Sequence, residues 1–108
     1  MGEALISGLV SSRFPKAQIV FTDKRTDRAR EISSKYGARE VSLTELVRSS
    51  DVILLVVKPQ DLEQLLNSIG SDLNKSATLV SFAAGKTTDF IGKIVGPSIS
   101  IIRVMPNT

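Results

Sequence analysis

The central hydrophobic run of the chain extends from Val52 to Val57, between Asp51 and Lys58-Pro59. These six consecutive apolar residues are too few for a stable helix and too uniformly apolar for a half-exposed strand. They therefore predict a parallel strand covered on both faces. Pro59 is expected to end the strand, because proline cannot donate to a ladder and biases the residue before it toward extended geometry. Open α/β sheets bind ligands at the carboxyl ends of such strands, although a core strand with no ligand at its end is the simpler alternative.

Around this run, short β-branched segments alternate with segments whose apolar residues recur at helical spacing. Gly37 follows one such segment where a left-handed cap would stand, and Ser42 with Glu45 matches a capping box. Thr26 and either Thr87 or Thr88 are expected to be N-cap residues. Helices are predicted at about 3–13, 26–36, 42–49, 60–69 and 87–95, and strands at 18–22, 39–41, 51–57, 78–82 and 98–104.

The alternation of strands with helices predicts the fold class. A βα spacing is typical of a mostly parallel sheet with helices on both faces, so we expect a three-layer αβα domain around a five-stranded parallel sheet. The length of 108 residues fits a single domain that spans the whole chain. The chain opens on a helix rather than a strand, which is unusual for this class.

Composition removes several classes of function. The net charge of +3 is dispersed among acidic residues, which does not indicate a nucleic-acid surface. The chain has no Cys and no His, so it offers no disulfide, thiolate nucleophile, Ser-His-Asp triad or histidine metal site. No stretch has the length of a membrane span or the pattern of a signal peptide, and a cytoplasmic location is expected. Any chemistry must then come from a cofactor or a partner domain.

Four stretches together carry a resemblance to one family. They occur in a fixed order, and the Met-Pro-Asn-Thr sequence after Ala-Ala-Gly and Val-Lys-Pro is a specific combination. The stretches are Met1-Gly-Glu-Ala-Leu-Ile-Ser-Gly-Leu9, Val57-Lys58-Pro59, Val80-Ser-Phe-Ala-Ala-Gly85 and Arg103-Val-Met-Pro-Asn-Thr108. In these residues the chain resembles the amino-terminal Rossmann domain of the pyrroline-5-carboxylate reductases, the oxidoreductases of proline biosynthesis. The resemblance covers essentially the whole sequence.

The same comparison implies that parts of that family are missing. The family opens with a strand leading into Gly-x-Gly-x-Met-Gly, and this sequence begins at the Met-Gly. The first strand, the first two glycines and the helical carboxyl-terminal domain are then absent, so we expect a truncated or engineered chain. The 108-residue chain alone is expected to be inactive and to bind a nicotinamide cofactor weakly or not at all.

The resemblance also implies roles for individual residues. Gly2, which permits close helix packing, would stand where the pyrophosphate of NAD or NADP approaches the first helix. An acid after the second family strand favours a free 2′-hydroxyl and an arginine favours a 2′-phosphate, so NADH and NADPH both stay open. No catalytic residue and no metal ligand is assigned. The residues implied near the adenosine ribose are Asp23, Lys24 and Arg25, and those implied on the nicotinamide side are Val57, Lys58, Pro59, Ala83, Ala84, Gly85 and Asn107.

Each of these roles has a simpler alternative. Asp23, Lys24 and Arg25 would otherwise form a solvated turn, Lys58 an exposed strand end, and the stretch from Ala83 to Gly85 a tight turn between strand and helix. In the family, hydride passes from the nicotinamide to the ring imine of pyrroline-5-carboxylate, a small-molecule substrate, and the protein mainly positions the cofactor.

The absent first strand leads to a topological expectation. A Rossmann sheet has the strand order 3-2-1-4-5-6, so its loss would leave buried backbone groups unpaired, at roughly 1–3 kcal/mol each. We expect the flanking strands to close the gap, with Gln18–Thr22 pairing in parallel with Asp51–Val57. The order would then be the flavodoxin-like 2-1-3-4-5. A homodimer that exchanges elements, or a molten or aggregated chain, is the alternative.

Three functional hypotheses follow from these observations. The chain is a cofactor-binding domain of a reductase, a structural chain of flavodoxin-like topology without a ligand, or a flavodoxin-like flavin binder or phospho-acceptor. The third is disfavoured because no Thr/Ser-rich phosphate loop or pair of acids follows the first strand.

Overall fold

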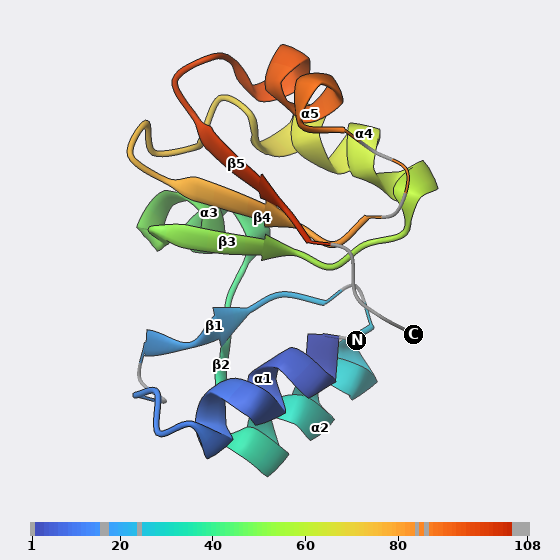
Figure 1. The fold of residues 1–108 in the computed structure, drawn as a ribbon. Coiled ribbons are helices and arrows are strands. Elements are labelled where there is room, and N and C mark those ends of the chain that lie inside the picture. Colours follow the sequence, from blue (N-terminus) through green and yellow to red (C-terminus); the bar gives the residue numbers. More distant parts are fainter. Residues whose placement is uncertain (1, 16–17, 24, 84, 86, 105–108) are drawn as a thin grey trace. The chain divides into compact units, whose positions relative to one another are not determined.

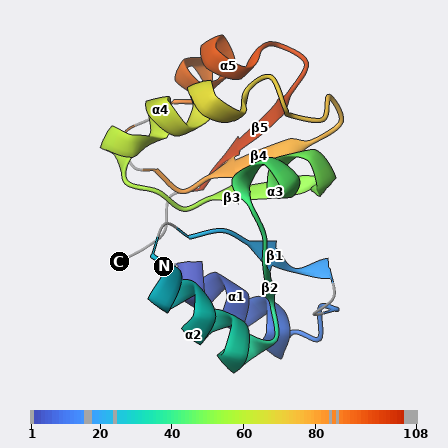
Figure 2. The same cartoon turned by 180° about the vertical axis from the view of Figure 1, so that it is seen from behind.

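The structure is a computed structural model that describes residues 2–15, 18–23, 25–83, 85 and 87–104. The chain divides into two compact units, Met1–Leu46 and Val47–Thr108. Helices and strands alternate through both units (Figures 1 and 2). The elements are α1 (Gly2–Ser11), β1 (Val20–Phe21), α2 (Thr26–Tyr36), β2 (Arg39–Glu40), α3 (Leu43–Ser49), β3 (Val52–Leu55), α4 (Pro59–Ile69), β4 (Thr78–Ser81), α5 (Thr88–Val95) and β5 (Ser100–Arg103).

The first unit packs α1 and α2 with a short parallel pair of strands. β1 pairs with β2, and Val20 stands opposite Arg39. The apolar stripe of α1 and the inner face of α2 supply the core, because residues three and four apart lie on one side of a helix. The buried core consists of Ile6, Ile19, Ile32 and Ala38, with Leu9, Val10, Phe21 and Tyr36 packed against it.

The ends of α2 test two of the expected caps. Thr26 is the first helical residue rather than the N-cap, so that prediction is wrong, and Arg25 at the N-cap position makes no side-chain cap bond. The Asp23 side chain accepts from the Arg25 amide at 2.9 Å, which shapes the turn before the helix. Gly37 adopts φ 76°, and its N–H donates to the Ser33 carbonyl. The left-handed cap predicted at Gly37 is confirmed.

The second unit contains a three-stranded parallel sheet in the order β3-β4-β5. In the ladder Ile53, Leu79 and Ile101 stand side by side. A Cβ added at Gly92 of α5 would lie 3.7 Å from the Ile101 Cδ1, so this face of the sheet is the one that α5 covers. Thr87 is the N-cap of α5, since its Oγ1 accepts from the Phe90 amide at 3.1 Å.

The central hydrophobic run forms a shorter and more exposed strand than expected. β3 ends at Leu55, and its residues alternate between exposed and buried. Val52 is 58% exposed and Leu54 is 38% exposed, whereas Ile53 and Leu55 are buried. The prediction of a strand covered on both faces is therefore wrong. β3 lies at the edge of its sheet, and within the second unit Ile53 and Leu55 lie on the buried face while Val52 and Leu54 lie on the exposed one.

The fold class is confirmed in its coarser form: five parallel strands alternate with helices in an α/β, Rossmann-like arrangement. The single five-stranded sheet with order 2-1-3-4-5 is not formed. Among the described residues the strands make two sheets, and no ladder joins β1 to β3. The expectation assumed that unpaired edge groups would be buried. An unpaired strand edge does not require a partner strand when water can satisfy its backbone groups.

The longest helices, α2 and α4, have 11 residues each. Within the described ranges, no helix is both long and apolar enough to cross a membrane.

Candidate functional site

The first unit carries the residues that the sequence associates with the adenosine and pyrophosphate. Gly2 is the first residue of α1, so the amides of the first turn have no acceptor within the helix. A Cβ added at Gly2 would meet no atom within 4 Å. The close packing expected at this glycine is therefore not seen in the described part of the chain.

The turn between β1 and α2, residues 22–25, is called the ribose turn below. Asp23 and Arg25 lie in it and are both exposed, whereas Lys24 lies outside the described residues. The Asp23 Oδ1 accepts from the Arg25 amide, and no described residue binds the other carboxylate oxygen. The Arg25 guanidinium lies 3.5 Å from an Asp27 oxygen, with both side chains more than 70% exposed. Water screens such a contact, so the Arg25 side chain is only weakly held.

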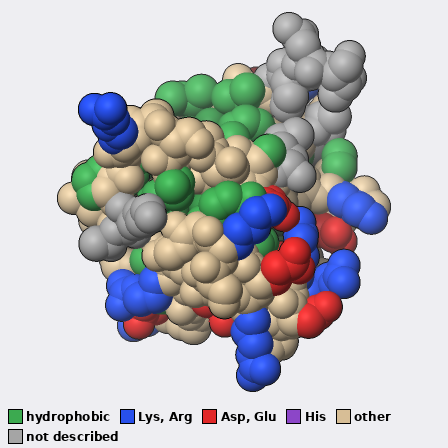
Figure 3. All heavy atoms as spheres, turned by 90° about the horizontal axis from the view of Figure 1, so that it is seen from below, with side chains coloured by type: hydrophobic (Ala, Val, Ile, Leu, Met, Phe, Trp, Pro, Cys, Tyr) green, Lys and Arg blue, Asp and Glu red, His purple; other side chains and the backbone are tan. Residues whose placement is uncertain are grey.

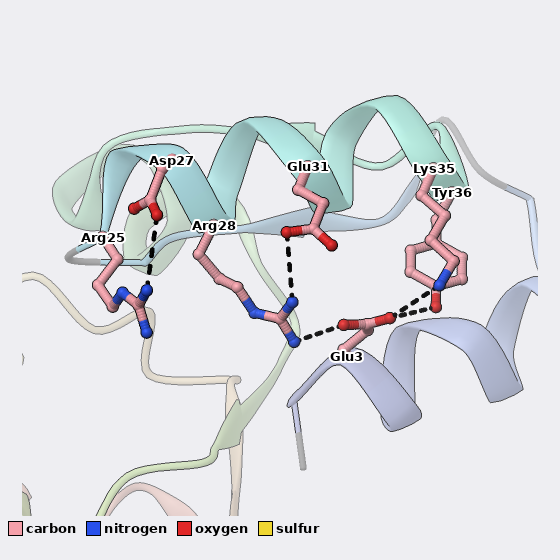
Figure 4. Close-up of polar contacts among 7 residues, drawn as sticks. All are labelled: Glu3, Arg25, Asp27, Arg28, Glu31, Lys35 and Tyr36. Carbon is pink, nitrogen blue, oxygen red and sulfur yellow. Dashed lines mark hydrogen bonds and ion pairs between the residues drawn. The ribbon is translucent and has the colours of Figure 1, made fainter.

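Next to this turn, one carboxylate joins the two helices of the first unit (Figure 4). The Glu3 Oε1 of α1 accepts from the Arg28 guanidinium of α2. Its Oε2 accepts from the Tyr36 hydroxyl at 2.7 Å and from the Lys35 ammonium at 3.3 Å. We call Glu3, Arg28, Lys35 and Tyr36 the Glu3 clasp. Sequence reasoning missed it, because nothing in the local pattern pairs an acid at position 3 with donors more than twenty residues away.

The clasp changes the acidity of its central group. The hydrogen bonds from Tyr36 and Lys35 and the charge of Arg28 lower the pKa of the Glu3 carboxyl from 4.5 to about 2. The same contact with Glu3 raises the pKa of Arg28. Glu3 is thus ionised at any pH near neutrality, and it brings one negative charge to the first turn of α1.

This pKa shift predicts a stability difference that depends on pH. A carboxyl whose pKa is lowered in the folded state stabilises fully above its unfolded value of 4.5 and loses that contribution as the pH falls toward 2. The Glu3→Gln variant should therefore have a lower urea midpoint than the unchanged chain at pH 6. The gap should narrow between pH 4.5 and 2, and a gap of constant size across that range would contradict the clasp.

The second unit carries the residues implied on the nicotinamide side. Val57 follows β3, Lys58 is the N-cap residue of α4, and Pro59 begins that helix, one residue earlier than expected. The Lys58 carbonyl accepts from the Asp61 amide, while its side chain is exposed. These three residues therefore form the turn from a strand end into a helix. In that position Lys58 presents a positive charge at the carboxyl end of β3.

The turn after β4 contains the other implied residues. Ala83 is buried, and its amide donates to the buried Ser81 hydroxyl at 3.3 Å. Gly85 is exposed with φ 76°, a conformation that favours glycine. Ala84 lies outside the described residues, as does Asn107.

Arg103, which the sequence reasoning quoted without a role, lies opposite Ser81 at the carboxyl end of β5. Its Nε is buried and has no hydrogen-bond partner among the described residues. An unpaired buried donor is costly, and here it lies at the sheet end where ligands of α/β folds bind.

One face of the molecule carries charges of both signs. The face drawn in Figure 3 shows acidic and basic side chains close together rather than an area of one sign. Within the described ranges, no group of three or more acidic, His or Cys side chains could hold a metal ion.

A sequence profile of the family described as "NADP oxidoreductase coenzyme F420-dependent" matches residues 1–85. The chain belongs to this NADP oxidoreductase family. Within the family its relatives include pyrroline-5-carboxylate reductase 1 of Bacillus subtilis, which is 35% identical over 111 residues and matches all of this chain. The chain matches the amino-terminal NAD(P)-binding domain of these reductases, as the four sequence stretches indicated. It spans 37% of the length of the Bacillus subtilis protein.

Solved structures agree with this membership in the NADP oxidoreductase family. A pyrroline-5-carboxylate reductase from Coxiella burnetii matches 99% of this chain and 40% of its own, with a TM-score of 0.92 and 26% identity. The Plasmodium falciparum pyrroline carboxylate reductase, solved with NADP bound, has a TM-score of 0.76 at 23% identity. It covers 96% of this chain and 38% of its own, and at that identity it supports the fold alone.

The residues present fit the two ends of such a dinucleotide differently. In the first unit, the exposed turn offers an oxygen of Asp23 that no described residue binds and that suits a ribose hydroxyl, and α1 offers first-turn amides. In the second unit, Arg103 offers a buried N–H donor that has no partner among the described residues. A Cβ added at Gly2 would meet no described protein atom, so the packing of the chain does not itself require a glycine at this position.

Proposed function

We propose that the chain is the cofactor-binding part of a pyrroline-5-carboxylate reductase, which reduces 1-pyrroline-5-carboxylate to L-proline with NADH or NADPH. The single observation that supports this most directly is the match of the whole chain to the amino-terminal part of such reductases. Family membership makes the nicotinamide cofactor the source of hydride, and the residues of this chain bind and orient it.

In the first unit, Asp23 accepts a hydrogen bond from the adenosine ribose in this proposal. The support is the position of its carboxylate, which one bond to the Arg25 amide holds at the carboxyl end of β1. The amides of Gly2 and its neighbours in the first turn of α1 would bind a phosphate oxygen, since a helix N-terminus favours negative charge.

In the second unit, the turn from Ala83 to Gly85 and the strand end at Val57 to Pro59 would contact the nicotinamide half. The Ser81 hydroxyl holds the Ala83 amide and so fixes the beginning of the first of these turns. The Lys58 ammonium would add positive charge near an anionic cofactor or substrate. In this proposal these groups position the cofactor, and no proton transfer is assigned to them.

Titration of the 108-residue chain with NADPH and NADH tests the proposal. We expect saturable binding with dissociation constants in the millimolar range, followed by calorimetry and by NMR shifts of amides in both units. The affinity is expected to be weak because the adenosine half would be held by one exposed carboxylate, Asp23, and by the first-turn amides of α1. Replacing Asp23 by Ala should reduce the shifts caused by NADH, whereas replacing the exposed Glu40 by Ala should not.

Two results would contradict the proposal. One is the absence of any NMR shift at 10 mM cofactor (roughly ten times the dissociation constants expected for such weak sites). The other is an equal loss of the NADH-induced shifts in the Asp23 and Glu40 variants.

We also expect no oxidation of NADPH by this chain in the presence of 1-pyrroline-5-carboxylate. The proposed binding partner of the parent enzyme is this small-molecule substrate. No nucleic acid and no membrane is proposed as a partner. Two further expectations stay predictions: a homodimer in which two copies exchange structural elements, and a cytoplasmic location.

A further inference from the structure

Three described arginines lie in or just after the ribose turn, and they differ in what they bind. Arg25 is exposed and only weakly held by Asp27. Arg28 is the third residue of α2. Arg30 is exposed and stands two residues further on, so it projects from a different side of the helix. In a Rossmann fold an arginine in this region is the group that accepts a 2′-phosphate. Arg28 is therefore the best-placed helical cation for that role.

Arg28, however, is already bound. Figure 4 shows its guanidinium reaching toward Glu3 on α1, with Glu31 on its other side. Its contact with Glu3 is the better shielded of the two, since the Glu3 side chain is only 25% exposed and the Glu31 side chain is 62% exposed. Glu3 is itself held by Tyr36 and Lys35, which fix its carboxylate in place. A 2′-phosphate would have to compete with this fixed carboxylate for the same guanidinium.

We infer that Glu3 is a specificity-determining residue: by binding the Arg28 guanidinium it keeps this cation from a 2′-phosphate and so shifts the cofactor preference of the site from NADPH toward NADH, although the exposed Arg25 can still reach a 2′-phosphate. The inference rests on the proposed function, in which the first unit binds the adenosine end of a dinucleotide. Asp23 acts in the same direction, because a carboxylate at the ribose turn accepts from a free 2′-hydroxyl and repels a phosphate. The clasp and Asp23 thus favour the same cofactor.

Two small probes isolate the effect of the 2′-phosphate: adenosine 5′-monophosphate and adenosine 2′,5′-bisphosphate. Their dissociation constants are measured on the 108-residue chain by NMR shifts of first-unit amides. The ratio of the two constants in the unchanged chain is the reference for the variants. The Glu3→Gln variant should shift the ratio of the two constants toward the bisphosphate by roughly threefold to tenfold, as a released arginine forms a charge-assisted contact that water partly screens.

Three further variants separate specificity from general effects. Glu40→Gln removes the same charge from an exposed position on β2 and should change the ratio by less than roughly twofold. Arg28→Met added to Glu3→Gln should return the ratio to that of the unchanged chain. Arg28→Met alone should leave the ratio unchanged, because Arg28 is already withdrawn, and this variant tests the inference even if Glu3→Gln does not fold.

The outcomes are distinguishable. If the unchanged chain binds neither probe, the proposed function fails and the inference falls with it. If both probes bind but Glu3→Gln weakens them equally, the clasp is only structural and the inference is overturned. It is also overturned if Glu40→Gln shifts the ratio as much as Glu3→Gln, or if Arg28→Met alone weakens the bisphosphate selectively.

Discussion

Replacing Leu79 by Ala should lower the free energy of unfolding by about 2–5 kcal/mol, the largest effect expected of a single truncation in the second unit. Leu79 is fully buried on β4, between Ile53 and Ile101 in the ladder. Its removal deletes apolar contacts and leaves a cavity at the centre of the face that α5 covers. Because a domain is stable by only ~5–15 kcal/mol, this loss removes a large fraction of its free energy of unfolding. Urea unfolding followed by circular dichroism measures the loss.

Leu54→Ala is the matched control for this prediction. It makes the same change on the neighbouring strand, but Leu54 is 38% exposed on the opposite face. We expect it to cost about 1 kcal/mol or less, since little apolar surface leaves the core. If the two variants lose equal stability, the two faces of the sheet are equally covered, and the exposure of β3 described above is wrong.

Replacing Ile32 by Ala should destabilise the first unit by about 2–4 kcal/mol. Ile32 is 5% exposed on the inner face of α2 and belongs to the buried cluster of this unit with Ile6, Ile19 and Ala38. Few other buried side chains can compensate, because the unit is small and its strands are short. Tyr36 is the single tyrosine of a chain without tryptophan, and it packs against this core. Its fluorescence therefore reports the unfolding of the first unit during a urea titration.

Ile32→Val supplies the graded control. It removes one methylene group and should cost about 0.5–1.5 kcal/mol. The urea midpoint of the Tyr36 signal should be lowest for Ile32→Ala, intermediate for Ile32→Val and highest for the unchanged chain. A midpoint that neither variant moves would show that Ile32 is not part of the core that Tyr36 reports.

Much of the local structure could be predicted from the sequence. The apolar spacing in residues 26–36 predicted a helix with Ala29 and Ile32 inside, and both are buried. Gly37 was expected to end that helix because a left-handed cap suits glycine, and it does. These features depend on residues within a few positions of one another. The same is true of the Thr87 cap, whose partner is three residues away.

The two wrong predictions about β3, its coverage on both faces and its pairing with β1, have a common physical origin. The run from Val52 to Val57 is apolar throughout, and composition alone does not say whether a second layer or a neighbouring strand covers it. The structure places Val52 and Leu54 on an exposed face and leaves β3 at a sheet edge. The expected pairing of β1 with β3 failed for the same reason, since the identity of a neighbouring strand depends on contacts far apart in the sequence.

The candidate site also separates into features that local sequence determines and features that depend on distant contacts. The sequence by itself determined the order of helices and strands, the faces that the helices bury and, through four short stretches, the family of the chain. Those properties follow from side-chain periodicity and local turn chemistry, which the order of residues encodes directly. Only the tertiary structure decided that the strands form two sheets and that Glu3 binds Arg28, Lys35 and Tyr36. Such partners meet only when the chain folds, because no local pattern records which distant donor will lie beside a given carboxylate.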